Sequence, residues 1–238
     1  MTNFLTARWE NLIMANYVID PAVLESYLPA GTEPDYFEGK TYVSLVGFMF
    51  LNTKIFGIPA WPFHDFEEIN LRFYVTRKEG GITKRGVVFI NETVPHRAVA
   101  WLANRIYREK YIAIPTKHHW NTDTEQLQVE YYWKVQKKWN HLKVSADGRK
   151  EDMRENSIEE FIFEHYYGYT KISTLYTDEY KVEHPRWQVH AVSSIDIDCD
   201  FEMMYGKNFS HLADQQPSSV MLATGSPISV KWKRSRFQ

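Results

Sequence analysis

This 238-residue chain has only one cysteine and almost no net charge. The single cysteine, Cys199, cannot form an internal disulfide, and no His/Cys cluster lies beside it to form a structural zinc site. The 28 basic and 30 acidic residues give a net charge of −2, so the chain as a whole generates no field that gathers nucleic acid or an anionic membrane. We therefore expect no metal, no nucleic-acid partner and no membrane partner.

Long apolar segments and targeting signals are missing as well. No window approaches the roughly 18 apolar residues that a membrane helix needs. The N-terminal segment places Arg8 and Glu10 ahead of only a short apolar patch, unlike a secretory signal, so we expect a cytoplasmic protein. The chain also lacks a glycine-rich phosphate loop and the GxSxG, HExxH and CxxC motifs. We accordingly predict no cofactor.

Aromatic residues are abundant: 8 Trp, 15 Tyr and 14 Phe lie in many short segments, which favours half-buried strands. Repeats, low-complexity tracts and flexible linkers are absent, which predicts a single domain over residues 1–238. The best candidate break is 145–157, where a turn dipeptide, Asp147-Gly148, is followed by a dense run of charge. We expect a long exposed loop there.

Helical patterns are few and short. Asp20-Pro21 is typical of a helix start, residues 97–107 carry apolar side chains at helical spacing, and Ser157 with Glu160 has the spacing of a capping box. Strands are expected at 41–51, 66–76, 86–92, 110–115 and 127–136, and in further short segments of the second half. Strands therefore dominate the predicted fold.

The segment 66–76 has the sharpest period-two pattern of the chain. Its apolar face consists of Ile69, Leu71, Phe73 and Val75, and its polar face of Glu68, Asn70, Arg72 and Tyr74. The polar face either meets water, where Glu68 and Arg72 would form a surface ladder of little energetic weight, or lines a cavity. Periodicity alone leaves both interpretations open.

Three further residues are candidates for a site. Tyr111 follows the predicted helix at 97–107, His165 lies in FEHYYGYTK (163–171), and His184 lies in EHPRWQ (183–188). Aromatic residues in such segments usually belong to a core, and the nine histidines show no metal-ligand spacing. The residues themselves do not decide between a core and a site.

The order of several motifs resembles a known family. The chain contains WENLIMANYVIDPAVLESYLPAGTEPD, YVSLVGFMF, FEEINLRFYV, GVVFINE, NRIYREKY, EHY and HPRW in succession. This order resembles the YqjF-like proteins, an uncharacterised bacterial family distantly related to acetoacetate decarboxylase. The resemblance covers about residues 5–232, and its most specific parts are the proline-bounded first helix, the Glu-x-Asn-x-Arg strand and the His-Pro-x-Trp turn.

The resemblance implies a fold and a place for the polar strand face. The fold would be a β-rich α+β, acetoacetate decarboxylase-like domain: an antiparallel β-cone or barrel of two related sheet systems, with a few short helices and a closed cavity. Glu68 matches the position of an acidic active-site residue that points into this cavity. Glu68, Asn70 and Arg72 would then contact a ligand from one side, and Tyr111, His165 and His184 from the opposite wall.

The decarboxylase chemistry does not carry over with the fold. Those enzymes form a Schiff base through one of two paired lysines, whose pKa is lowered by its surroundings. Here the matching stretch is NRIYREKY, where Tyr111 occupies the nucleophile's position and Lys110 would project to the opposite strand face. The arginine that precedes the first helix in the decarboxylases is also missing, because Ile19 precedes Asp20. We therefore expect no Schiff-base decarboxylation.

Three functional hypotheses remain. The first is a cavity that binds a small polar or anionic organic molecule. The second is an enzyme, a lyase, hydratase or isomerase, that works by acid–base chemistry with Glu68 and forms no covalent intermediate. The third is a partner-binding module whose cavity is filled by side chains. Edge strands of such a sheet can also pair between chains, which would give a homodimer.

Overall fold

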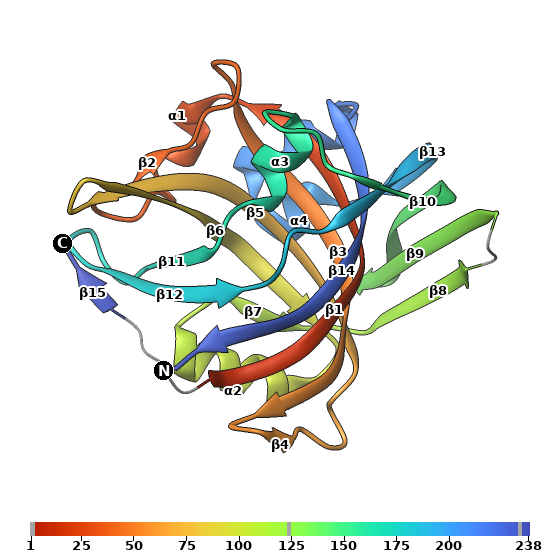
Figure 1. The fold of residues 1–238 in the computed structure, drawn as a ribbon, viewed down its shortest axis with the longest axis horizontal. Helices are drawn as coiled ribbons and strands as arrows, with labels where there is room; N and C mark the ends of the chain where they lie inside the picture. The colour runs from red at the N-terminus through yellow and green to blue at the C-terminus, as the bar shows by residue number, and fades with distance from the viewer. Residues whose placement is uncertain (1–2, 123–124, 233–234) are drawn as a thin grey trace.

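The computed structural model describes residues 3–122, 125–232 and 235–238. Its strands form one continuous sheet in the order β15-β12-β11-β6-β5-β3-β1-β14-β13-β10-β9-β8, and β2, β4 and β7 pair at its side (Figure 1). The first-half strands are β1 (Asn3–Ile19), β2 (Glu33–Pro34), β3 (Thr41–Ile55), β4 (Ile58–Pro59), β5 (Phe66–Glu79), β6 (Ile82–Val94), β7 (Tyr111–Ala113) and β8 (Thr116–Thr122). The remaining strands are β9 (Gln126–Val135), β10 (Lys138–Asp152), β11 (Tyr167–Lys171), β12 (Thr177–Glu183), β13 (Gln188–Asp198), β14 (Ser219–Lys231) and β15 (Ser235–Phe237).

An additional pairing between β12 and β14 closes part of this sheet into a barrel. Val182 and Glu183 of β12 pair with Val230 and Ser229 of β14, so the ring runs through β12, β11, β6, β5, β3, β1 and β14. Strands β8, β9, β10 and β13 continue beyond the ring and cover its outer face. The strands of the ring therefore have one face toward the barrel interior and the other toward a second layer.

The helices are few and short: α1 (Pro21–Leu24), α2 (Arg97–Tyr107), α3 (Ile158–Phe163), α4 (Phe201–Tyr205) and the 3₁₀ helix η1 (Lys207–Asp214). The Asp20 side chain accepts a hydrogen bond from the Ala22 amide and caps α1, and the Ser157 hydroxyl accepts one from the Glu160 amide and caps α3. Both predicted helix starts are thus confirmed. None of the helices in the described ranges is long and apolar enough to cross a membrane.

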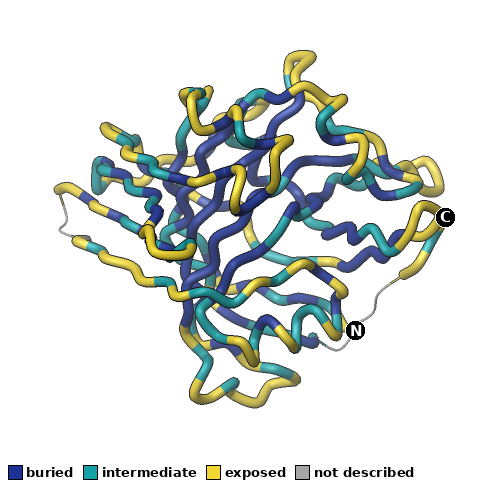
Figure 2. Tube along the Cα trace, turned by 180° about the vertical axis from the view of Figure 1, so that it is seen from behind, coloured by how far each residue is buried: buried dark blue, intermediate teal, exposed yellow. Residues whose placement is uncertain are grey.

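Two apolar clusters occupy the two faces of the ring strands. The outer cluster contains Leu71 and Phe73 of β5 together with Tyr131 and Trp133 of β9, and it fills the space between the two layers. The inner cluster lies inside the barrel and includes Phe48 of β3. Figure 2 shows the consequence along the trace: long runs of the central strands are buried, whereas exposed segments lie at the loops and the outlying strands.

The hairpin of β5 and β6 is confirmed, and its register determines which side chains face one another across the two strands. Asn70 pairs with Glu92, and a bulge after Leu71 shifts the register so that Arg72 pairs with Phe89. Residues 66–71 are all buried. Glu68 and Asn70 are therefore shielded from bulk water and Arg72 is half-buried, so the surface-ladder interpretation of these residues is wrong.

The β-rich fold with few short helices is confirmed, with two differences in detail. The sheet systems are joined into one continuous sheet, and the pairings of β6 with β7 and with β11 are parallel.

The exposed loop expected at 145–157 is wrong in its first part, because β10 continues to Asp152. Asp147 pairs there with Gln126, and the turn dipeptide falls where the register between β10 and β13 shifts. Cross-strand pairing outweighs the local turn preference.

Candidate functional site

A cavity of about 160 Å³ lies inside the barrel. Its wall is mostly apolar and aromatic, with Phe48, Phe66, Val87, Phe163 and Trp187 among the lining residues. Its polar and titratable lining residues include Glu68, Asn70, Arg72, Glu92, Glu109, Tyr111, His165, Tyr180 and His184. All six residues that the sequence proposed for a site thus line one cavity. A filled interior, which the partner-module hypothesis required, is not what the structure has.

The alternation of β5 aims three polar side chains into the cavity. Glu68, Asn70 and Arg72 point inward, while Ile69 and Leu71 between them pack in the outer cluster. The Asn70 Nδ2 donates a hydrogen bond to Glu68 Oε1 at 3.0 Å. The Asn70 Oδ1 is buried and has no hydrogen-bond partner among the described residues. These three side chains, the polar row of β5, therefore include an acid and an amide that orient each other. The acceptor oxygen of the amide, Asn70 Oδ1, remains available to a ligand.

Tyr111 reaches Glu68 from β7, which pairs with β6 next to Glu92, so Tyr111 lies on the same wall as Glu68 and not on the opposite wall as expected. The Asn104 side chain of α2 accepts a hydrogen bond from the Tyr111 amide at 2.7 Å and donates one to the Tyr111 carbonyl at 2.9 Å, which fixes β7 against the helix. The Tyr111 hydroxyl then donates to Glu68 Oε2 at 2.9 Å. The carboxyl of Glu68 is thus held at both oxygens.

Burial controls the protonation of Glu68. Removal from water raises the pKa of its carboxyl to about 7, although the hydrogen bonds from Asn70 and Tyr111 and the positive charge of Arg72 act in the opposite direction. A carboxyl with this pKa exists in both protonation states near neutral pH. Glu68 can therefore accept or release a proton there.

Arg72 is a cation with unused hydrogen-bonding capacity. Its Nη2 makes only long contacts, at 3.4 Å to the Ile162 carbonyl and at 3.5 Å to the Met14 sulfur. Its Nε is buried without a partner among the described residues. A guanidinium in this state offers donors to an incoming anion.

Two buried carboxyls at the cavity were not predicted from the sequence. Glu92 is 2% exposed, lies opposite Asn70, hydrogen-bonds to Tyr111, and leaves its Oε2 without a partner in the part of the chain described. Glu109 accepts a hydrogen bond from the Thr170 hydroxyl at 2.6 Å and another from Tyr180. Burial raises the pKa of Glu109 to about 7 and that of Glu92 well above its ordinary value.

Only Glu109 had a signal in the sequence. The regular register of the predicted hairpin, in which Arg72 pairs with Phe89, would set Asn91 beside Asn70, and it is the bulge between Leu71 and Arg72 that brings Glu92 to that position. Glu109 belongs to the NRIYREKY stretch, two residues before Tyr111, which the sequence had already proposed for the site.

His165 is held as a neutral base beside the cavity. Its Nε2 lies 3.1 Å from Asp35 Oδ2, which also accepts a hydrogen bond from Arg85 Nε at 2.7 Å. Burial alone would raise the pKa of Asp35, but the hydrogen bonds from His165 and Arg85 hold it below its ordinary value. Burial lowers the pKa of His165 to about 4. The Nδ1 atom has no partner among the described residues and, with Nε2 donating to Asp35, carries a lone pair.

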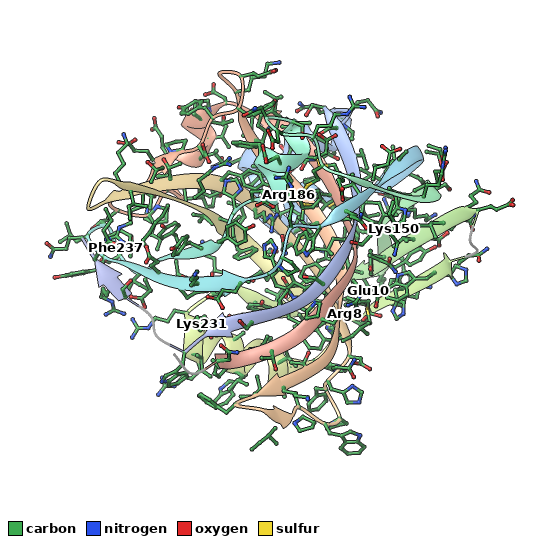
Figure 3. All side chains as sticks on the ribbon, viewed as in Figure 1. Arg8, Glu10, Lys150, Arg186, Lys231 and Phe237 are labelled. Atoms are coloured by element: carbon green, nitrogen blue, oxygen red, sulfur yellow. The ribbon has the colours of Figure 1, made fainter. Side chains whose placement is uncertain are left out.

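His184 is fixed by its own turn. The ring stacks on Trp187 with centroids 4.2 Å apart, and its Nδ1 lies 2.9 Å from the Pro185 carbonyl. Burial lowers the pKa of this imidazole. Two contacts hold this turn in place. Trp187 Nε1 donates a hydrogen bond to the Ser226 hydroxyl at 2.8 Å, and Arg186, labelled in Figure 3, forms an ion pair with Glu160 of α3 at 2.8 Å.

The cavity wall has no amine for a Schiff base. Lys110 is exposed, and its ammonium lies 5.6 Å from the centre of the Tyr27 ring, away from the cavity. No lysine is among the described residues that line the cavity, and Arg72 is their one permanent cation. Across the residues with described positions, no three His, Cys, Asp or Glu side chains form a metal-binding group.

Solved structures with the same architecture include three enzymes. An acetoacetate decarboxylase-like enzyme from Sphingomonas wittichii RW1 superposes with a TM-score of 0.67 at 12% identity, over 100% of this chain and 94% of that one. The enduracididine biosynthesis enzyme MppR, complexed with pyruvate, gives 0.66 at 12% identity over 100% and 92%. Acetoacetate decarboxylase from Legionella pneumophila gives 0.62 at 11% identity over 95% and 84%. These likenesses show that the chain has the acetoacetate decarboxylase-like fold.

Sequence comparison gives the family. The uncharacterized protein YqjF of Bacillus subtilis (strain 168) is 28% identical over 116 residues, which are 48% of this chain and 46% of YqjF. The match thus spans about half the length of that relative. The profile of the DUF2071 family, described as an uncharacterized conserved protein, matches residues 6–227. The chain therefore belongs to the DUF2071 family.

Proposed function

We propose that the barrel cavity binds a small organic acid whose carboxylate pairs with Arg72. The observation that carries this proposal is the state of the guanidinium, which is half-buried, makes only two long hydrogen bonds, and has a buried Nε without a partner among the described residues. A carboxylate accepts two parallel hydrogen bonds from such a group. The apolar remainder of the wall would cover the carbon skeleton of the ligand.

The size of the cavity limits the ligand. A void of about 160 Å³ is close to the roughly 150 Å³ in which a buried cavity accommodates a molecule the size of benzene. The ligand is therefore a molecule of about six non-hydrogen atoms. The presence of pyruvate in one of the similar solved structures supports the same class of ligand.

Calorimetric titration tests this proposal. Propionate, pyruvate and lactate would be compared with propionamide and lactamide, which keep the shape but lose the charge. We expect the acids to bind and the amides to bind at least tenfold more weakly. Arg72→Met should lose this preference, whereas Arg105→Met, an exposed position on α2 outside the cavity, should keep it. If the Arg72→Met variant binds the acids as tightly as the wild-type protein does, the proposal is overturned.

Acid–base catalysis on the bound acid is the second candidate function. The observation that favours it is the 2.9 Å hydrogen bond from Tyr111 to Glu68, a carboxyl whose pKa is raised to about 7. In this reaction the Glu68 carboxylate takes a proton from the carbon next to a carbonyl group, and the Arg72 guanidinium stabilises the oxygen on which the negative charge develops. Return of the proton completes an exchange or isomerisation without a covalent intermediate.

Exchange of hydrogen in D₂O tests this second function. Proton NMR would follow the methyl signal of pyruvate in the presence of the protein and report its replacement by deuterium. We expect exchange above the protein-free rate, a loss of at least a hundredfold in Glu68→Gln, and a smaller loss in Tyr111→Phe. Exchange that persists unchanged in Glu68→Gln would contradict the role of this carboxyl and leave the binding function intact.

A further inference from the structure

Two acceptor oxygens without hydrogen-bond partners meet on the cavity face of β5 and β6. Asn70 and Glu92 are paired across the two strands, and side chains in such a pair have Cβ atoms roughly 5 Å apart. Asn70 is 1% exposed and Glu92 is 2% exposed, and both line the cavity. Asn70 Oδ1 and Glu92 Oε2 are each buried and unpartnered among the described residues. Because unpaired buried acceptors are costly, this position is suited to a ligand group that donates hydrogen bonds.

The charges of the cavity wall point in the same direction. Three carboxyls, Glu68, Glu92 and Glu109, line the cavity, against the single guanidinium of Arg72. Burial holds protons on these carboxyls near neutral pH, and a ligand that brings only a carboxylate makes their ionisation less favourable still. A ligand that also carries a positive group can pair with a carboxyl that ionises.

We propose that the organic acid carries an ammonium group as well, which binds between Asn70 Oδ1 and Glu92 Oε2 while its carboxylate binds Arg72. This inference rests on the proposed function, since it places the carboxylate in the same way. The chemical class is a small zwitterion, an amino acid or amino carboxylic acid. Alanine and β-alanine each have six non-hydrogen atoms, which agrees with the size of the void.

The row along β5 gives the two charges of such a ligand separate places. Asn70 and Arg72 project into the cavity from alternate positions, about 6 to 7 Å apart along the strand. The anion site therefore lies at one end of the row and the cation site beside it, opposite Glu92. The Glu68 carboxyl, oriented by Asn70 and Tyr111, stays available at the far end.

Proton linkage distinguishes a zwitterion from a simple acid. The charged and titratable groups around Glu92 are Glu68, Glu109, Tyr111 and Tyr180, with Arg72 further along β5. The carboxylate of a simple acid pairs with Arg72 and offsets its positive charge. Because that charge favours ionised carboxyls in the wall, binding of the acid favours their protonation. An ammonium group between Asn70 and Glu92 favours an ionised Glu92. Binding of an amino acid should therefore take up fewer protons than binding of its matched simple acid.

Matched ligands test the inference on the folded protein. The pairs are β-alanine with propionate, and alanine with lactate and pyruvate, because each pair shares a carbon skeleton and a carboxylate. Calorimetry near pH 7 in two buffers of different ionisation heat would give affinity and proton uptake together. We expect at least tenfold tighter binding of the amino compound in one or both pairs, with a proton uptake lower by about one.

Variants assign the effect to Glu92. Glu92→Gln should remove most of the preference for the amino compound while still binding propionate, and Glu202→Gln, an exposed carboxyl on α4, should behave as the wild type. Circular dichroism and a thermal melt would verify that Glu92→Gln is folded. Equal or weaker binding of the amino compounds, or a preference that survives in Glu92→Gln, would overturn the inference and leave the proposed function standing. Absence of binding by every acid in the panel would instead overturn the proposed function.

Discussion

The two faces of β5 are both turned away from bulk water over residues 66–75 and have opposite chemistry. On the outer face, Ile69, Leu71 and Phe73 are fully buried and pack against Tyr131 and Trp133 of the second layer. On the inner face, the same strand buries an acid, Glu68, and an amide, Asn70, and half-buries the guanidinium of Arg72, beside a cavity of about 160 Å³.

The difference shows where burial stabilises the fold and where it serves another purpose. Apolar side chains that interdigitate on the outer face contribute directly to stability. The inner face keeps a void and several polar atoms without hydrogen-bond partners among the described residues, both of which cost stability. Such a cost is typical of a site that completes its contacts only when a ligand is bound.

The largest expected effect contrasts the two faces directly. Phe73→Ala should lower the free energy of unfolding by about 3 to 5 kcal/mol, because it opens a cavity in the packed layer. Asn70→Ala on the inner face should cost only about 1 kcal/mol, since it loses one hydrogen bond beside an existing void. Urea denaturation of both variants measures this. Similar losses for both would show that the inner face is as tightly packed as the outer one.

A pH-dependent effect of intermediate size concerns Glu109. Its pKa is about 7 in the folded chain and near 4.5 in the unfolded chain, so between these values the unfolded state releases its proton first and stability falls as the pH rises. Glu109→Gln removes this loss. Relative to wild type, the variant should gain about 3 kcal/mol between pH 4.5 and pH 8.

Denaturation at several pH values would check the Glu109 prediction. His165, whose pKa is lowered to about 4, makes both proteins less stable as the pH falls from 6.5 to 4, and this contribution cancels in the difference. A variant whose advantage is independent of pH would contradict a buried carboxyl that stays protonated in the folded chain.

The smallest effect is expected at Lys110. Lys110 is exposed, and its ammonium lies 5.6 Å from the centre of the Tyr27 ring. Lys110→Ala should therefore change the unfolding free energy by less than about 0.5 kcal/mol. Treatment with acetoacetate and borohydride should leave no covalent adduct on either protein, as a mass spectrum would show. An adduct present in the wild type and lost in Lys110→Ala would restore the Schiff-base chemistry that we do not expect here.

The sequence predicted much of this fold because the informative patterns are local. The alternation in 66–76, the capping serine at 157 and the Asp20-Pro21 start each determine their own element. The continuation of β10 through Asp147-Gly148 was not predictable in this way, since it depends on pairing with β9 and β13.

The candidate site was predictable only in part for the same reason. The polar face of β5 is a property of one segment, and Glu68, Asn70 and Arg72 follow from it directly. Glu92 and Glu109 enter the cavity through strand register and the closure of the barrel, and the anchoring of His165 by Asp35 joins residues 130 positions apart. Non-local pairing of this kind leaves no periodic signal in the sequence.

A crystal structure of the protein grown with pyruvate, at a concentration that saturates the calorimetric titration, tests the pairing of an organic acid with Arg72 most directly. We predict one pyruvate in the barrel cavity, with its carboxylate within hydrogen-bond distance of Arg72 Nε or Nη2 and its carbonyl end toward Glu68. A cavity that contains only water under these conditions, or pyruvate bound elsewhere with Arg72 still unpaired, would contradict this prediction.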